Sequence, residues 1–335
     1  MMNAGGAAPQ VHKDRRDWHN LKGMLPFLWE FRGRALFALS CLILSKVANV
    51  GVPLVLKEIV EFFEHAKEQP LMLAAVLPLS LLVAYGALKL AASLFNELRD
   101  VVFAKVRYRA MRRLSTRVLE HLHRLSLGFH LDRRTGAVSR DLERGTRSVS
   151  QILNYMAFSV LPIMVEFSLV AFILLRDYEL EFALAMFGSV VVYIFVTFAI
   201  TEWRMDFRHF MNRLDSEANT QAFDSLINYE TVKYFGNERL ELDRYDSTLA
   251  EWEDWAVKSQ TSMSLLNFGQ GAVIALGVTL VMCLAMRGVV AGEISIGDLV
   301  LLNAFLLQLF IPLGFLGIVY RQIKYSLADM DLVFK

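Results

Sequence analysis

The sequence predicts an all-α membrane protein with six long transmembrane helices that continue into the cytoplasm. Of the 335 residues, 55% are hydrophobic and 21% are charged, and the mean hydropathy of +0.39 is too high for a soluble domain of this size. A helix that crosses the hydrocarbon core needs about 20 predominantly apolar residues. Six stretches approach that length, namely residues 35–60, 71–94, 152–175, 180–200, 262–286 and 294–319.

Basic residues indicate the orientation of these spans. They concentrate in residues 99–147, between spans two and three, and in residues 204–258, between spans four and five. The short connections on the other side contribute only Lys67, Arg176 and Arg287. Because positively charged loops stay inside, both long segments and both termini are expected in the cytoplasm. The charges form no single basic face and the net charge is only +1, which argues against nucleic-acid binding.

The two long cytoplasmic segments are predicted to be helical. Apolar residues recur at helical spacing beside charged ones in residues 99–127, 202–226 and 238–262. At about 1.5 Å per residue, these helices carry the spans on the order of 30 Å beyond the bilayer. Each segment breaks once, first at residues 126–136, where Gly128 and Gly136 interrupt the helix, and again at residues 228–237. Short elements at such tips suit docking surfaces rather than pore walls.

The N-terminal segment does not have the composition of a signal peptide. Residues 1–20 are polar and lack the apolar core of a signal peptide, so a disordered tail is expected to precede a membrane domain at residues 21–330. This favours a bacterial inner membrane over the mitochondrial inner membrane.

Cys41 and Cys283 lie in apolar spans and are expected to pack there, and the seven histidines lack the spacing of a metal site. Kinks are predicted at Pro53, Pro162 and Pro312.

The run LINYETVKYFGNE at residues 226–238 carries a family resemblance. Together with ITEWR at residues 200–204 and NRLD at residues 212–215, it resembles the ABC exporter family that includes the mitochondrial iron–sulfur-linked exporter and its bacterial heavy-metal-tolerance relatives. Supporting matches occur at residues 125–136, 143–146, 315–321 and 327–330. The resemblance extends from about Trp18 to the C-terminus.

This resemblance implies the transmembrane fold of a type I exporter, also called type IV, in a domain-swapped homodimer. It also implies that the segments near residues 126–138 and 226–238 are coupling helices that contact nucleotide-binding domains. The alternative is that their aromatic residues pack the helix pair together. The expected coupling residues are Phe129, Asp132, Arg133, Arg134, Thr135, Tyr229, Glu230, Lys233, Tyr234 and Phe235.

ATP chemistry is expected outside this chain. A phosphate-binding loop of the form G-x-x-x-x-G-K-[ST] does not occur in the sequence, so the chain itself is predicted not to be an enzyme. The resemblance places ATP and Mg²⁺ in a nucleotide-binding domain, in cis or on a separate subunit, and makes residues 331–335 the start of the linker to it.

A polar stripe follows span four. Arg204, Arg208, Asn212 and Asp215 are spaced four, four and three residues apart, which places them on one helix face. A solvated cytoplasmic face explains Asn212 and Asp215, which lie deeper in the cytoplasm. Arg204 and Arg208 lie nearest the membrane, where paired guanidiniums in a central cavity bind carboxylates well.

Two amides at the start of span five, Asn267 and Gln270, also share one helix face. Hydrogen bonding between helices is one explanation of them. The resemblance instead implies that they bind glutathione together with Arg204, Arg208 and Arg321. Asn154, where a relative has tyrosine, completes the predicted set. The expected cargo is oxidised glutathione, a glutathione–metal adduct or a glutathione persulfide.

The sequence departs from the family pattern near the cavity, since Ile311 and Gly314 replace an arginine and an acidic or amide residue of some bacterial relatives. Inside the spans, Lys46 and Glu166 are ionisable and therefore expensive to bury. They are expected either to form one buried pair or, in the case of Lys46, to attract anionic cargo.

Three alternatives to a glutathione exporter stay open at this point. A secondary transporter would need inverted repeats and helices broken at mid-membrane, which the sequence does not show. The chain is otherwise a truncated or split membrane subunit that serves as a scaffold or partner, or it exports an unrelated amphipathic cargo.

Overall fold

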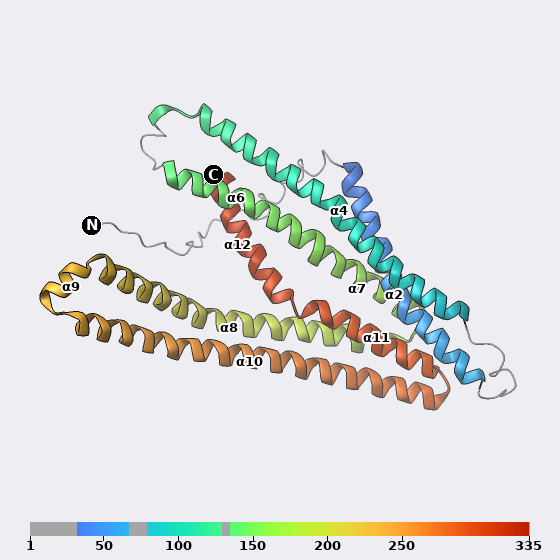
Figure 1. Ribbon diagram of the computed structural model, residues 1–335. Coiled ribbons are helices and arrows are strands. Elements are labelled where there is room, and N and C mark those ends of the chain that lie inside the picture. Colours follow the sequence, from blue (N-terminus) through green and yellow to red (C-terminus); the bar gives the residue numbers. More distant parts are fainter. Residues whose placement is uncertain (1–31, 67–78, 129–134, 335) are drawn as a thin grey trace. The chain divides into compact units, whose positions relative to one another are not determined.

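A computed structural model describes residues 32–66, 79–128 and 135–334 (Figure 1). The predicted tail at residues 1–20 lies outside them. The described elements are α2 (Arg32–Ala66), α4 (Leu79–Arg124), α6 (Thr135–Tyr155), a π-helical turn η1 (Met156–Val160), α7 (Leu161–Asp177), α8 (Leu180–Ile227), α9 (Tyr229–Phe235), α10 (Glu238–Ala291), α11 (Ile296–Leu313) and α12 (Leu316–Phe334).

Within the described ranges, six helical segments are long and apolar enough to cross a membrane, as predicted, and the protein is a multi-pass membrane protein. The third of them combines α6, η1 and α7, and the sixth combines α11 and α12. The six segments are Arg32–Glu64, Leu79–Arg124, Leu142–Asp177, Leu180–Ile227, Glu238–Ala291 and Ile296–Leu327.

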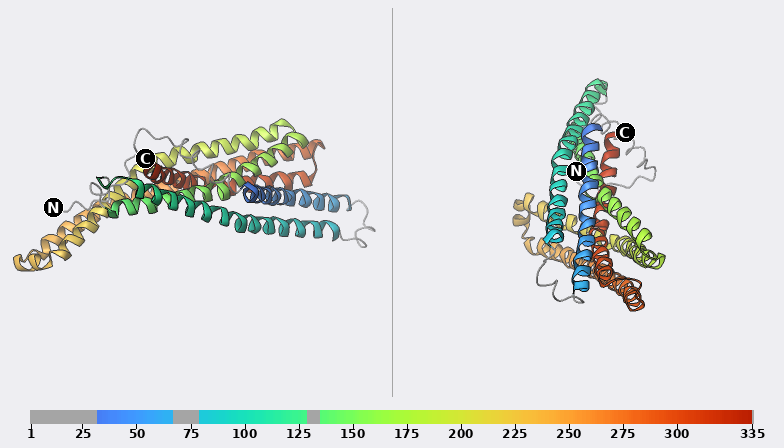
Figure 2. Two further views of the ribbon diagram at one scale, coloured as in Figure 1. Left: turned by 90° about the horizontal axis from the view of Figure 1, so that it is seen from above. Right: turned by 90° about the vertical axis from the view of Figure 1, so that its right-hand side faces the viewer.

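The chain divides into two compact units. The first comprises residues 1–183 and 281–335, and the second comprises residues 184–280. In the first unit α2 packs along α4, α7 and α11, while α6 packs against α4 and α12 (Figures 1 and 2). An apolar core joins α4, α6 and α12, and its buried members are Ala110, Leu114, Val149, Ile152, Leu153, Leu327 and Met330.

The third span deviates from α-helical geometry immediately before Pro162. The Leu161 N–H donates to the carbonyl of Met156, five residues back, which defines the π turn. Pro162 is the second residue of α7, where its missing N–H costs least. A π turn therefore directly precedes the proline at which a kink was predicted. The Arg99 guanidinium lies 4.7 Å from the ring centroid of Phe158 within this turn.

One detail of the predicted helix boundaries was wrong. Gly136 does not interrupt a helix, because α6 begins at Thr135 and includes it; in the first turn its N–H needs no helical partner. In span six, α11 ends at Leu313 and α12 begins at Leu316. The interruption follows Pro312 directly, one of the prolines at which a kink was predicted.

The second unit consists mainly of α8 and α10, which run side by side with α9 at their joint tip (Figures 1 and 2). Phe210 of α8 stacks on Trp255 of α10, with ring centroids 4.6 Å apart. The predicted break at residues 228–237 is confirmed. It contains α9, which ends where Gly236 adopts the left-handed conformation at φ 63° and the Asn237 N–H donates to the Val232 carbonyl.

Candidate functional site

A polar stripe runs along α8 in the second unit. Thr197, Thr201, Arg204 and Arg208 are spaced four, three and four residues apart, so they share one helix face. Thr197, Thr201 and Arg204 are buried, and Arg208 is half-buried. The two threonines extend the predicted arginine pair further into the span and were missed by the sequence prediction, although their spacing was visible.

The two predicted cargo-binding amides of α10, Asn267 and Gln270, differ in whether they contact the polar stripe of α8. Gln270 Nε2 donates a 3.0 Å hydrogen bond to Thr197 Oγ1. The two helices lie close together here, since a Cβ at Gly269 would be in van der Waals contact, at 3.4 Å, with the side chains of Ile200 and Val196. Gln270 thus makes the hydrogen bond between helices that was one of its two explanations, whereas Asn267 is exposed.

The two arginines are not equivalent. Arg204 is only 6% exposed, so most of its guanidinium is already inside the protein. Arg208, one turn further into the cytoplasm, is half-buried and the more accessible of the pair. Asn212 and Asp215 are exposed, in keeping with a solvated face.

The other two predicted cargo residues belong to the first unit. Asn154 Oδ1 accepts a 2.6 Å hydrogen bond from Arg107 Nη1, so its side chain joins α6 to α4. Arg321 is half-buried on α12. The departures Ile311 and Gly314 are both exposed at the end of α11.

The intramembrane charges form one buried pair, as one of the two explanations expected. Lys46 Nζ lies 2.7 Å from Glu166 Oε2. The other carboxylate oxygen, Oε1, accepts hydrogen bonds from Asn49 at 3.1 Å and Gln308 at 2.5 Å. Glu166 is 2% exposed, so these three donors satisfy a charge that is sealed from solvent. We call these four residues the buried brace; it joins α2, α7 and α11.

The tip helix α9 is exposed along its whole length apart from the half-buried Val232. Tyr234 is 87% and Phe235 75% exposed, so these two rings do not pack the helix pair together, which removes the alternative explanation of them within this chain. Lys233 Nζ pairs with Glu238 Oε1 at 2.7 Å and lies over the Tyr229 ring. Glu230 is also exposed. Large exposed aromatic area is typical of a protein–protein contact.

The first predicted coupling segment is described only at its margins. Phe129, Asp132, Arg133 and Arg134 lie outside the described residues, and Thr135 is the first residue of α6. Among the described residues, no group of three or more His, Cys, Asp or Glu side chains is placed to hold a metal ion. Cys41 is buried as predicted, but Cys283 is exposed on this chain and does not pack inside it.

Six spans, helices that continue far beyond membrane length and an exposed aromatic tip together define the membrane domain of a transporter. Residues 35–313 match the ABC transporter transmembrane region family, and the chain belongs to this family. The resemblance drawn from the sequence is confirmed.

The chain is similar in sequence to transporters of one type. It is 42% identical over 325 residues to the "Iron-sulfur clusters transporter ABCB7, mitochondrial" of Homo sapiens, covering 94% of this chain and 43% of that protein. It is 40% identical to the "Iron-sulfur clusters transporter ATM1, mitochondrial" of Saccharomyces cerevisiae, covering 94% and 46%. The solved "Structure of a bacterial Atm1-family ABC exporter with ATP bound" matches with a TM-score of 0.66 and 39% identity, covering 90% of this chain and 53% of that chain. The chain thus spans about half the length of the proteins it matches.

Proposed function

We propose that this chain is the membrane-spanning half of an ATP-driven exporter that moves glutathione-related compounds out of the cytoplasm by alternating access. The cargo is oxidised glutathione, a glutathione–metal adduct or a glutathione persulfide. The chain acts as a homodimer in a bacterial inner membrane. ATP and Mg²⁺ bind to nucleotide-binding domains that the described helices do not include.

The observation that carries this proposal is the arrangement of guanidinium and amide groups in the second unit. Arg204 and Arg208 share a face of α8, and Gln270 of α10 bonds to Thr197 on that same face. Glutathione carries carboxylates and amides. Guanidinium groups bind carboxylates with paired, charge-assisted hydrogen bonds, and exposed Asn267 supplies an amide that can bond to a peptide group.

The exposed tip supports coupling to an ATPase. Tyr229, Tyr234 and Phe235 present rigid aromatic area with little conformational entropy to lose. A partner domain that moves on ATP binding and seats on α9 would pull on α8 and α10 together, because both helices end at this tip.

Calorimetric titration of glutathione disulfide into the purified transporter in detergent tests the cargo. We expect saturable binding to the wild type and at least about tenfold weaker binding to Arg204→Ala/Arg208→Ala, because two charge-assisted contacts are lost. Asn212→Ala/Asp215→Ala is the matched control, since it removes exposed groups from the same helix face and is expected to bind as the wild type does. Equal binding by both variants would place the site elsewhere, and no binding to the wild type would exclude this cargo.

A further inference from the structure

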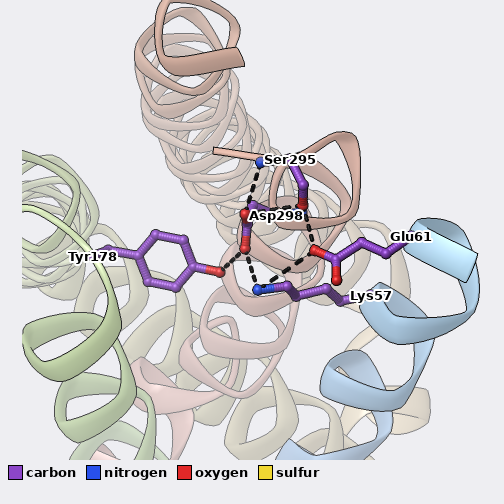
Figure 3. Close-up of polar contacts among 5 residues, drawn as sticks. All are labelled: Lys57, Glu61, Tyr178, Ser295 and Asp298. Carbon is purple, nitrogen blue, oxygen red and sulfur yellow. Dashed lines mark hydrogen bonds and ion pairs between the residues drawn. The ribbon is translucent and has the colours of Figure 1, made fainter. Parts of the chain in front are cut away.

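A second polar cluster of the first unit lies where the last part of α2 meets the start of α11 (Figure 3). Its members come from the end of α2, the short connection between α7 and α8, and the start of α11. The weakly basic connections on this side are those that the charge distribution places outside the cytoplasm. We call the cluster the outer cluster; it consists of Lys57, Glu61, Tyr178, Ser295 and Asp298.

Asp298 is the centre of the outer cluster. Its Oδ1 lies 2.6 Å from Lys57 Nζ and also accepts a hydrogen bond from the Tyr178 hydroxyl. Its Oδ2 accepts from the Ser295 backbone N–H at 2.8 Å, which forms the capping box of α11. Burial, and then the neighbouring Asp298, raise the pKa of Tyr178 above its ordinary value, so its hydroxyl stays a donor at neutral pH. One carboxylate thus ties three elements together.

The α2–α11 contact inside the outer cluster is close. Ser295 Oγ donates to Glu61 Oε1 at 2.5 Å. A Cβ at Gly297 would lie 2.7 Å from Glu61 Cγ and 2.9 Å from the Lys57 carbonyl oxygen, so the helices can approach this closely only because residue 297 is glycine.

The outer cluster is partly exposed on this chain. The side chains of Lys57 and Glu61 are 26% and 23% exposed, and that of Asp298 is 10% exposed. The ion pair of the buried brace is less exposed at both ends, at 19% for Lys46 and 3% for Glu166. A partly exposed pair near helix ends costs less to separate than a buried one.

A proline separates the two clusters along α2. Pro53 lies seven residues after Lys46 of the buried brace and four residues before Lys57 of the outer cluster. Because proline has no N–H, the carbonyl of Asn49 loses its helical partner and the helix bends more easily there. The brace therefore fixes α2 on one side of a flexible point, and the outer cluster fixes it on the other.

We propose that the outer cluster is a latch: it holds the outer end of α2 against α11 and the α7–α8 connection, and it opens and closes in each transport cycle, with Pro53 as the pivot. This inference rests on the proposed export function, which needs an outer opening through which cargo leaves. Lys57 and Asp298 act as positioning residues for that opening.

The test locks the latch in the complete transporter, reconstituted in lipid vesicles. In a background with Cys41→Ala and Cys283→Ser, the pair Lys57→Cys/Asp298→Cys is joined by a short, reducible bifunctional thiol reagent. We expect ATP-driven export of glutathione disulfide to fall at least about tenfold on cross-linking, since the open state becomes inaccessible, and to return when a reductant cleaves the link. Recovery shows that the locked protein is folded.

The control pair is Gln151→Cys/Ser326→Cys, which joins α6 to α12 where the native side chains bond at 3.0 Å. Cross-linking of this control pair is expected to leave the export rate within about twofold of the rate before cross-linking. Full export by the locked outer pair would overturn the latch. If the unmodified wild type exports no glutathione disulfide, the cargo proposal fails, and ATP hydrolysis then decides on the latch: a reversible loss on locking supports it and an unchanged rate refutes it.

Discussion

Two polar clusters of the first unit each connect α2 to α11, but they do so in different surroundings. The buried brace joins α2, α7 and α11 through Glu166, which is 2% exposed and accepts three hydrogen bonds. The outer cluster joins α2, the α7–α8 connection and α11 through Asp298, whose partner Lys57 has 26% of its side chain exposed. If the outer cluster opens as proposed, the difference in exposure gives the reason why this contact and not the brace is remade in every cycle.

The physical reason lies in what replaces a lost partner. Glu166 is 3% exposed inside an apolar span, so separating it from Lys46 leaves a carboxylate unpaired in a medium of low dielectric constant. The pair of Lys57 and Asp298 is more exposed, at 26% and 10%, and is expected to cost less to separate. The brace is therefore suited to permanent attachment and the outer cluster to reversible attachment.

The largest effect is expected from breaking the brace. Glu166→Ala leaves Lys46, Asn49 and Gln308 without their shared acceptor, and we expect it to lower the free energy of unfolding by about 3–5 kcal/mol. Thermal unfolding of the purified protein in detergent measures this loss.

Two further variants control for the brace prediction. Ser168→Ala, on the same helix, removes an exposed hydroxyl that bonds only to its own helix, and it is expected to change little. Lys46→Met/Glu166→Met removes both charges and is expected to recover part of the loss, because no unpaired ion is left buried. A Glu166→Ala variant as stable as Ser168→Ala would show that the brace does not contribute this free energy to stability.

Much of this fold could be predicted from the sequence, because hydropathy and charge asymmetry report directly on the membrane. Among the described residues, a helix of membrane length occurs at each of the six predicted spans. The break predicted at residues 228–237 is present, and Gly236 ends α9 there in the left-handed conformation. The exact helix ends at Gly136 and after Pro312 could not be predicted, because glycine is tolerated in a first turn and a proline only biases where a helix stops.

The two clusters show which parts of the sites could not be predicted from the sequence. Lys46 and Glu166 could be recognised as costly charges, but their pairing depends on which faces meet in the folded unit. Asn49, three residues after Lys46, carried a usable signal. So did Ser295 and Asp298, whose spacing is that of a capping box. Tyr178 carried none, since its bond to Asp298 spans 120 residues and arises only on folding.

A smaller loss is expected from the outer cluster. Asp298→Asn removes the charge that pairs with Lys57 and weakens the cap of α11, and we expect it to lower the free energy of unfolding by about 1–2 kcal/mol. Added salt should reduce the difference from the wild type, because a partly exposed pair is screened, whereas the Glu166→Ala deficit should persist. Melting curves at low and high ionic strength measure both.

Asp177→Asn is the matched control for Asp298→Asn. Asp177 lies at the same end of the spans and pairs with Arg176 at 3.5 Å, but both side chains are at least half exposed. We expect no measurable change from it. A salt-independent Asp298→Asn deficit as large as that of Glu166→Ala would remove the distinction between the two clusters.

The smallest effect is expected from Tyr178→Phe, which removes one hydroxyl from the outer cluster and keeps the ring that contacts Phe182. The loss of this hydrogen bond should cost only about 1 kcal/mol, because the Asp298 carboxylate keeps its bonds to Lys57 and to the Ser295 N–H. Because the pKa of Tyr178 is raised on folding, its contribution is present below the ordinary tyrosine pKa of about 10 and is lost as the pH rises beyond it. Melting curves over a pH series should therefore show a constant loss of stability for Tyr178→Phe near neutral pH and a smaller loss at alkaline pH. Tyr234→Phe, at an 87% exposed site, is expected to show no loss. A Tyr178→Phe deficit that grows with alkaline pH would mean that this hydroxyl does not donate to Asp298.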